Sequence, residues 1–256
     1  MCTLIALHRR IEDSALVVAA NRDEFLERPT EGPALRDASI AGPGVARARI
    51  VAPLDRRAGG TWLGVNERGL FAAVTNRRTE SSDPARRSRG WLVMAALSEP
   101  SARRAAERIA ALDPADHNPF NFYAADGESA HWVSSAEKAE RFDLAPGAHV
   151  IGNLHPDETS PKLERLRSEA EALCAGPGPS LEALADVCRN HAGDSPLDAT
   201  CVHAGSYGTR SSTLLRIGRD PSLHYADGPP CQHRYRDLTP LLRDLGIVRS
   251  AEALRA

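Results

Sequence analysis

The stretch MCTLIALHRRIEDSALVVAANRDEF, residues 1–25, decides the fold of this chain. Apolar runs at residues 3–9 and 15–20 flank a turn at residues 11–14. Two short apolar runs separated by a polar turn are typical of a β-hairpin. We therefore predict that the chain begins inside a sheet. Because the distal ends of a hairpin meet, the start of the chain should lie close to residues 21–25.

Cysteine directly follows the initiator methionine, and removal of Met1 would leave Cys2 with both a thiol and a free α-amine. A free cysteine thiol has a pKa of roughly 8.5 and an α-amine roughly 7.7–8.0, so the amine can accept the thiol proton near neutral pH. Cys2 is therefore a candidate nucleophile that carries its own base. The alternative is a cysteine that is second in the chain by chance.

The second strand of the hairpin runs into a polar motif at residues 21–24. Arg22 would lower the pKa of a nearby thiol, and Asp23 would accept a hydrogen bond from the α-ammonium or hold Arg22 in place. The alternative is an exposed Arg/Asp pair at a strand end, which is worth under about 1 kcal/mol.

Three more polar side chains lie beside predicted strand ends, namely Asn76, Asn153 and Arg210. Asparagine amides are suitable donors for a developing oxyanion, and an arginine can bind a carboxylate or phosphate through two hydrogen bonds. The alternative for each asparagine is an ordinary turn residue.

The remaining pattern alternates hairpins with helix pairs. We predict strands at residues 61–65, 70–75, 120–125, 130–134, 149–152, 212–217 and 223–226, and helices at 90–97, 102–112, 161–174, 181–191 and near the C-terminus. Residues 28–60, rich in Pro, Gly and Arg, are predicted to form a long loop that covers a site. These elements predict one α+β domain over residues 1–256, with two stacked antiparallel sheets covered by helices.

Composition argues against several classes of partner. The net charge is −2, with 32 basic and 34 acidic residues, so we expect neither nucleic acid nor an anionic membrane surface as partner. No stretch reaches the roughly 18–20 apolar residues that span a bilayer, and the N-terminus does not have the pattern of a signal peptide. Lys138 and Lys162 are the two exceptions among basic residues that are otherwise arginine, a bias we attribute to a GC-rich genome.

The five cysteines are scattered and odd in number, which favours free thiols in a reducing cytoplasm. The pair Cys201 and His203 has the ligand types of a zinc site. No second Cys/His pair follows at a recognisable zinc spacing, so the sequence predicts no metal.

Taken together, the motifs resemble the NRDE family, which is the transport and Golgi organization protein 2 family. The blocks that carry the resemblance run in order from residue 1 to about 228 and are MCTL at 1–4, ANRDEF at 20–25, RPT at 28–30, GGTWLGVN at 59–66, TNR at 75–77, SRG at 88–90 and YGTRSST at 207–213. The resemblance implies an Ntn-hydrolase-like αββα four-layer sandwich, similar to penicillin V acylase and bile salt hydrolase.

Those enzymes cleave amide bonds through an acyl-enzyme, so the resemblance implies a cysteine-type amidohydrolase acting on a small amide or acyl conjugate, with no cofactor. Carried over by motif, Cys2 is the nucleophile and Arg22 and Asp23 support it. Asn76 and Asn153 stabilise the oxyanion and orient the α-amine, and Arg210 is the electrostatic anchor.

One departure concerns the supporting pair. In the acylases intervening residues separate the arginine from the aspartate, whereas Arg22 and Asp23 are adjacent. Adjacent strand residues point to opposite faces, so only one can face Cys2 unless a bulge intervenes. Glu24 is the alternative support.

The resemblance has a second implication, because members of the family are linked to haem trafficking and to lipid or acyl-CoA handling. The alternative function is therefore a carrier that binds haem or a lipid-like ligand without turnover. The candidate axial ligands are a cysteine or one of His8, His203, His224 and His233. No Cys-x-x-Cys-His or Cys-Pro motif supports any of them. The substrate and the oligomeric state stay open.

Overall fold

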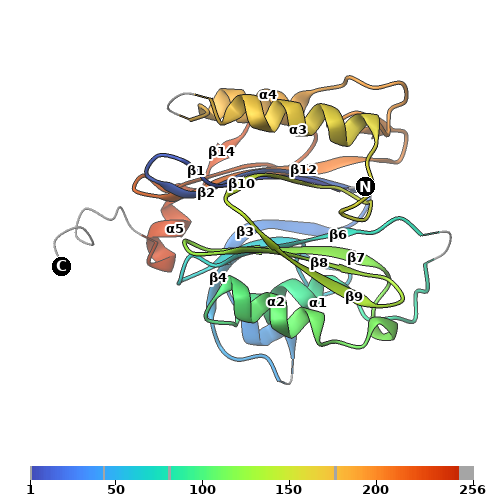
Figure 1. Ribbon diagram of the computed structural model, residues 1–256, viewed down its shortest axis with the longest axis vertical. Helices are drawn as coiled ribbons and strands as arrows, with labels where there is room; N and C mark the ends of the chain where they lie inside the picture. The colour runs from blue at the N-terminus through green and yellow to red at the C-terminus, as the bar shows by residue number, and fades with distance from the viewer. Residues whose placement is uncertain (1, 43, 80–81, 176–177, 248–256) are drawn as a thin grey trace. The chain divides into compact units, whose positions relative to one another are not determined.

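A computed structural model describes residues 2–42, 44–79, 82–175 and 178–247, which form two compact units (Figure 1). Unit 1 takes in the described residues up to 28, then 146–150 and those from 159 onward. Unit 2 takes in the described residues of 29–145 and 151–158. Each unit contains one seven-stranded antiparallel sheet and its own helices, so the predicted α+β class is confirmed.

The unit 1 sheet is built around the predicted N-terminal hairpin. Its strand order is β10 (Gly147–Ile151), β1 (Cys2–Ile11), β2 (Ser14–Phe25), β12 (Tyr207–Gly218), β13 (Ser222–Ala226) and β14 (Arg236–Asp237), with β11 (His203–Ala204) also paired to β12. Strands β2 and β12 are longer than their apolar runs predict. The polar motifs at 21–24 and 207–211 therefore lie within paired strands and not beyond strand ends, because backbone pairing continues past the apolar residues.

Helices α3 (Pro161–Leu173) and α4 (Leu181–Arg189) cover one face of this sheet (Figure 1). The hydroxyls of Ser160 and Ser180 accept hydrogen bonds from the first turns of these helices, which fixes where each begins. The predicted C-terminal helix is α5 (Thr239–Leu245), which packs against β13.

The unit 2 sheet follows chain order and is a simple meander. Its strands are β3 (Thr30–Asp37), β4 (Arg49–Asp55), β5 (Leu63–Asn66), β6 (Phe71–Asn76), β7 (Phe120–Ala125), β8 (Ala130–Ser135) and β9 (Ala139–Leu144). Helices α1 (Gly90–Leu97) and α2 (Ala102–Ala110) pack on it over a buried apolar core, and short 3-10 turns occupy Ala38–Ala41 and Pro114–Asp116.

The prediction of a long loop over residues 28–60 is wrong. This segment contains β3, the 3-10 turn at Ala38–Ala41 and β4, and β3 is an edge strand of the unit 2 sheet. An edge strand tolerates Pro33 because it needs hydrogen bonds on one side only, and the β3–β4 register shifts between Glu31 and Ala34. Pro53 lies beyond the part of β4 that pairs with β5. These prolines are therefore explained by an edge of the sheet and not by an irregular loop.

Helix length and hydropathy bear on the membrane prediction. Within the described part of the chain, no helix combines the length and the apolar character needed to cross a bilayer.

Candidate active site

The hairpin places Cys2 directly opposite Arg22 in the β1–β2 ladder. Side chains of directly opposed residues lie on the same face of a sheet, so Arg22 shares the face of the Cys2 thiol. The Cys2 Sγ lies 3.9 Å from the backbone carbonyl oxygen of Asp23. Burial raises the pKa of the Cys2 thiol, and the charge of Arg22 acts in the opposite direction.

Arg22 is buried and is held by the acidic residue that follows Asp23. Its Nη2 lies 3.6 Å from Oε2 of Glu24, which also lies 3.6 Å from Nε of Arg28. Glu24 thus pairs with both Arg22 and Arg28.

Asp23 follows Arg22 on a regular strand, so its side chain belongs to the opposite face. There the hydroxyl of Thr209 donates a 2.7 Å hydrogen bond to Oδ1, and the Tyr207 hydroxyl donates to the Asp23 carbonyl at 3.1 Å. The second carboxyl oxygen, Oδ2, is buried and has no hydrogen-bond partner among the described residues. Burial raises the pKa of Asp23 to about 6, while Lys162 and the Thr209 hydrogen bond act in the opposite direction.

A β-bulge does occur at this site, but on β12. The register passes from Thr209 opposite Asp23 to Ser211 opposite Arg22, which leaves Arg210 as the extra residue. Arg210 donates a 2.8 Å hydrogen bond to Asp227, whose side chain is 51% exposed. The predicted anchor is thus on the strand next to β2, and its charge is already paired with a carboxylate that solvent can screen.

Lys162 is a site residue that the sequence analysis missed. It is the second residue of α3 and is half-buried, and its charge acts on both Asp23 and Cys2. Burial lowers the pKa of Lys162, and the two acidic groups raise it. Lysine is rare in this chain, which has only one other, Lys138, and this rarity was the feature of the sequence that could have pointed to Lys162.

Asn21, the first residue of the polar motif, has a structural role. Its Nδ2 donates to the backbone carbonyls of Cys188 at 2.8 Å and of Thr200 at 2.9 Å. One buried amide therefore joins β2 to the last turn of α4 and to the segment that precedes β11.

The two candidate oxyanion residues belong to unit 2, where the structure brings them together. The Nδ2 of Asn153 donates a 2.5 Å hydrogen bond to the backbone carbonyl of Asn76, and the backbone N–H of Arg78 donates to the Asn153 carbonyl. The carbonyl of Gly152 accepts hydrogen bonds from the side chains of Thr75 on β6 and Asn121 on β7. The side-chain amide of Asn76 is exposed, so it is open to a ligand.

The four histidines considered as haem ligands have different environments. His8 is buried and stacks on His149, with ring centroids 6.2 Å apart. His224 is half-buried on β13, and burial lowers its pKa. His203 and His233 are exposed, and the Nε2 of His203 lies 3.2 Å from the Sγ of Cys231.

Solved structures with similar folds are acylases and amidases. The penicillin V acylase of Agrobacterium tumefaciens superposes with a TM-score of 0.62 at 14% identity, covering 94% of this chain and 88% of that one. The mutant C2A conjugated bile acid hydrolase of Clostridium perfringens gives 0.59 at 12% identity, covering 94% and 93%. An N-acylethanolamine-hydrolyzing acid amidase orthologue of Caenorhabditis elegans gives 0.53 at 13%, covering 84% and 92%. These likenesses confirm the predicted Ntn-hydrolase-like fold.

Sequence comparison identifies the family. The chain is 29% identical over 233 residues to the mouse Transport and Golgi organization 2 homolog, covering 79% of this chain and 82% of the relative. The human Transport and Golgi organization protein 2 homolog is 28% identical over 243 residues, covering 83% and 85%. The family model described as Transport and Golgi organisation 2 matches residues 1–228. The chain therefore belongs to the Transport and Golgi organisation 2 family.

Proposed function

We propose that this protein is a cysteine-type N-terminal-nucleophile amidohydrolase that acts on a small amide or acyl conjugate. The observation that carries the proposal is the position of Cys2. It begins β1, faces Arg22 across the hairpin and places its sulfur 3.9 Å from the Asp23 carbonyl. The fold shared with amide-cleaving enzymes supports the same reaction class.

In the proposed reaction, removal of Met1 makes Cys2 the N-terminal residue. The Cys2 amine takes the thiol proton, and the thiolate attacks the substrate carbonyl to form a tetrahedral intermediate. Collapse of this intermediate breaks the C–N bond, and the protonated amine returns the proton to the leaving group. Water then attacks the acyl-enzyme and releases the acid together with the free thiol.

The surroundings of Cys2 support a base close to the thiol. Burial raises the pKa of the thiol and the charge of Arg22 lowers it, so a base beside the sulfur would favour the thiolate. The Oδ2 of Asp23 is a buried acceptor without a partner among the described residues, and we assign it to the α-ammonium that forms during the reaction.

The remaining roles follow from the family resemblance. We assign the oxyanion to the side-chain amides of Asn76 and Asn153, because amide donors stabilise the charge that develops on a carbonyl oxygen. We assign Arg210 to an acidic group of the substrate, which would compete with Asp227 for the guanidinium. No metal or cofactor takes part in this scheme. The free state of all five cysteines is consistent with a cytoplasmic setting.

Intact-mass spectrometry of protein without an N-terminal tag tests the proposal. We expect loss of Met1 and a single acyl adduct from a thiol-reactive acyl probe, mapped to Cys2 by peptide analysis because Cys231 is exposed as well. Cys2→Ser should lose the adduct, whereas Cys174→Ser should keep it. Retention of Met1, or an unreactive Cys2, would overturn the proposal.

A carrier of haem or of a lipid-like ligand is the second candidate function. The names of the curated relatives refer to transport and Golgi organization and not to hydrolysis, which is the observation that favours it. A carrier would keep its affinity in Cys2→Ser and with Met1 retained. Haem titration of both forms, followed by the absorbance of the Soret band, separates the carrier from the hydrolase.

A further inference from the structure

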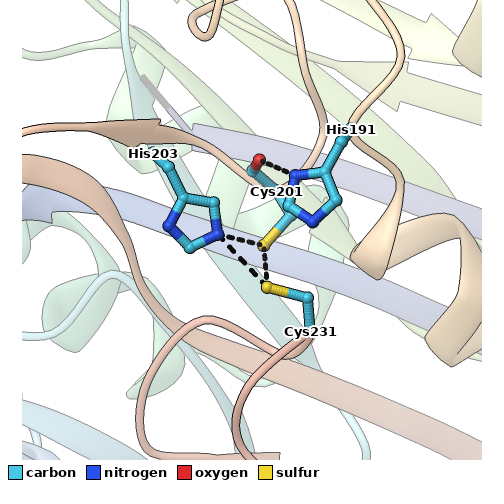
Figure 2. Close-up of side chains that lie close together, drawn as sticks. All are labelled: His191, Cys201, His203 and Cys231. Atoms are coloured by element: carbon cyan, nitrogen blue, oxygen red, sulfur yellow. Dashed lines mark hydrogen bonds between the residues drawn. The ribbon is translucent and has the colours of Figure 1, made fainter.

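Four side chains of types that can bind a metal converge in unit 1 from segments that are far apart in the sequence. The cluster consists of His191, Cys201, His203 and Cys231, and Figure 2 shows the four side chains directed toward one another. One ligand atom from each residue lies within 4.8 Å of the corresponding atoms of the other three. The two sulfurs are 3.6 Å apart, and the Nε2 of His203 lies 3.7 Å from one sulfur and 3.2 Å from the other.

These distances match the edges of a tetrahedral metal site. With Zn–S bonds of about 2.3 Å and Zn–N bonds of about 2.0–2.1 Å, the edges of a Cys₂His₂ tetrahedron are about 3.3–3.8 Å long. The three separations that involve His203 and the two cysteines lie at or close to this range. Only small movements of the side chains would be needed to bind an ion.

The fourth residue, His191, is oriented by a backbone contact. Its Nδ1 lies 3.1 Å from the carbonyl oxygen of Cys201, and this acceptor places the ring proton on Nδ1 (Figure 2). The Nε2 lone pair is then available for a metal. A hydrogen bond from the second ring nitrogen to a carbonyl is the usual support of a metal-binding histidine.

The fold also holds the segment that contributes two of the ligands. Residues Cys201 and His203 flank Val202, whose N–H donates to Thr209 Oγ1 at 2.9 Å. Gly208 allows this close approach, because a Cβ at that position would lie 2.6 Å from the carbonyl oxygen of Val202. The cluster therefore sits on a defined piece of backbone.

Solvent can also reach the cluster. A cavity of about 300 Å³ is lined by residues that include His191, Asp194, Cys201 and His203. Of the four cluster residues only Cys201 is buried. An ion can therefore reach the sulfur of Cys201 without opening of the fold.

We propose that His191, Cys201, His203 and Cys231 form a Zn²⁺ site. Binding would release the two thiol protons and leave a neutral site of two thiolates and two neutral imidazoles. The site would join the segment after α4, the segment at β11 and the segment after β13. It would also act on the active site, because the Thr209 hydroxyl that accepts from Val202 donates to Asp23.

The sequence spacing argued against a metal because it lacked a second Cys/His pair beside Cys201 and His203. The structure supplies this pair from two separate segments, His191 before the first pair and Cys231 far after it. The close approach of the two sulfurs also allows an alternative, a Cys201–Cys231 disulfide, although a distance of 3.6 Å leaves both thiols free here.

Metal titration of the full chain, purified without a polyhistidine tag, tests the site. After reduction and treatment with a chelator, the protein is titrated with Zn²⁺ against a chromophoric chelator, and with Co²⁺ as a spectroscopic probe. We expect one ion per chain, with thiolate-to-Co²⁺ charge-transfer bands and the strong visible bands of a tetrahedral site. Removing a direct ligand should weaken binding at least about 100-fold, because even outer-shell changes cost 10–100-fold.

Cys231→Ser and His203→Gln are the variants of choice, because both side chains are exposed and the fold does not depend on their packing. Cys174→Ser removes a thiol outside the cluster and should bind Zn²⁺ like the wild type. Absence of binding by the reduced protein, or equal binding by all three variants, would overturn the site. The site would also be overturned if the purified protein contains a Cys201–Cys231 disulfide and still binds no metal after reduction. These outcomes do not depend on the reactivity of Cys2.

Discussion

The hydroxyl of Thr209 donates a 2.7 Å hydrogen bond to the Asp23 carboxylate, although the two residues are 186 positions apart in the chain. The same oxygen accepts a hydrogen bond from the N–H of Val202. A single buried side chain therefore joins β2, β12 and the segment before β11. Thr209 therefore contacts both Asp23 of the candidate active site and the backbone between Cys201 and His203 of the proposed Zn²⁺ site.

Replacing Thr209 by valine should destabilise the fold by about 1–3 kcal/mol, because valine has the same shape but leaves the Val202 N–H and the Asp23 carboxylate without their buried partner. Urea unfolding followed by circular dichroism measures the effect. Thr209→Ser keeps the hydroxyl and should lose much less. Equal stability of the valine and serine variants would contradict the role assigned to this hydroxyl.

Asp23→Asn should change how stability depends on pH. Burial raises the pKa of Asp23 from its ordinary value of 3.8 to about 6, so the folded state holds this proton more tightly than the unfolded state does. The stabilisation is complete below pH 3.8 and is lost as the pH rises through about 6. The full change is about 3 kcal/mol, because one pKa unit corresponds to about 1.4 kcal/mol.

Asparagine at position 23 cannot titrate, but it can still accept the hydrogen bond from Thr209. We therefore expect the free energy of unfolding of Asp23→Asn to exceed that of the wild type above pH 6, with the difference disappearing below about pH 4. Parallel urea titrations between pH 3.5 and pH 7.5 measure this difference. A difference that is constant over this range would mean that the pKa of Asp23 is not raised.

Lys162→Met should raise the pKa of Asp23 further, because the lysine charge opposes the effect of burial. The measurement is the carboxyl carbon shift of Asp23 followed by NMR as a function of pH. Lys138→Met is the matched control, because Lys138 is the one other lysine, lies in unit 2 and is 77% exposed. If both variants shift the midpoint equally, the effect is one of net charge and Lys162 has no local role.

Local sequence patterns predicted the parts of the site that depend on neighbours in the chain. The hairpin of apolar runs and the approach of Cys2 to Arg22 are such features, and the β1–β2 register confirms both. The partner of Asp23 was not predictable in this way, since Thr209 reaches it only through the pairing of β2 with β12 and past the bulge at Arg210.

Three other features could not be predicted from the sequence, each for a different reason. Residues 28–60 have the composition of a loop, but an edge strand with a register shift tolerates that composition. Lys162 looked like a surface charge, and only the packing of α3 brings its charge close to Asp23. The cluster of His191, Cys201, His203 and Cys231 does not match a recognisable zinc-binding spacing in the sequence, because three separate segments contribute its side chains.

Asn21→Ala tests whether the backbone before Cys201 supports the proposed Zn²⁺ site. The substitution removes the amide that binds the carbonyls of Cys188 and Thr200, and two buried carbonyls without partners should cost about 2–5 kcal/mol. Because Thr200 directly precedes Cys201, we expect weaker Zn²⁺ binding as well. Chelator competition at a temperature where the variant is folded measures the affinity.

The chain offers a matched control for this change. Asn121 is also fully buried and donates its amide to two backbone carbonyls, those of Gly152 and Leu154, but it belongs to unit 2. Asn121→Ala should lose at least as much stability, because Asn121 Oδ1 also accepts a 3.2 Å hydrogen bond from the Trp132 indole N–H, and it should keep the Zn²⁺ affinity of the wild type. Equal loss of affinity in both variants would assign the effect to general destabilisation. A loss confined to Asn21→Ala would mean that β2, which carries Arg22 and Asp23, also positions the metal ligands.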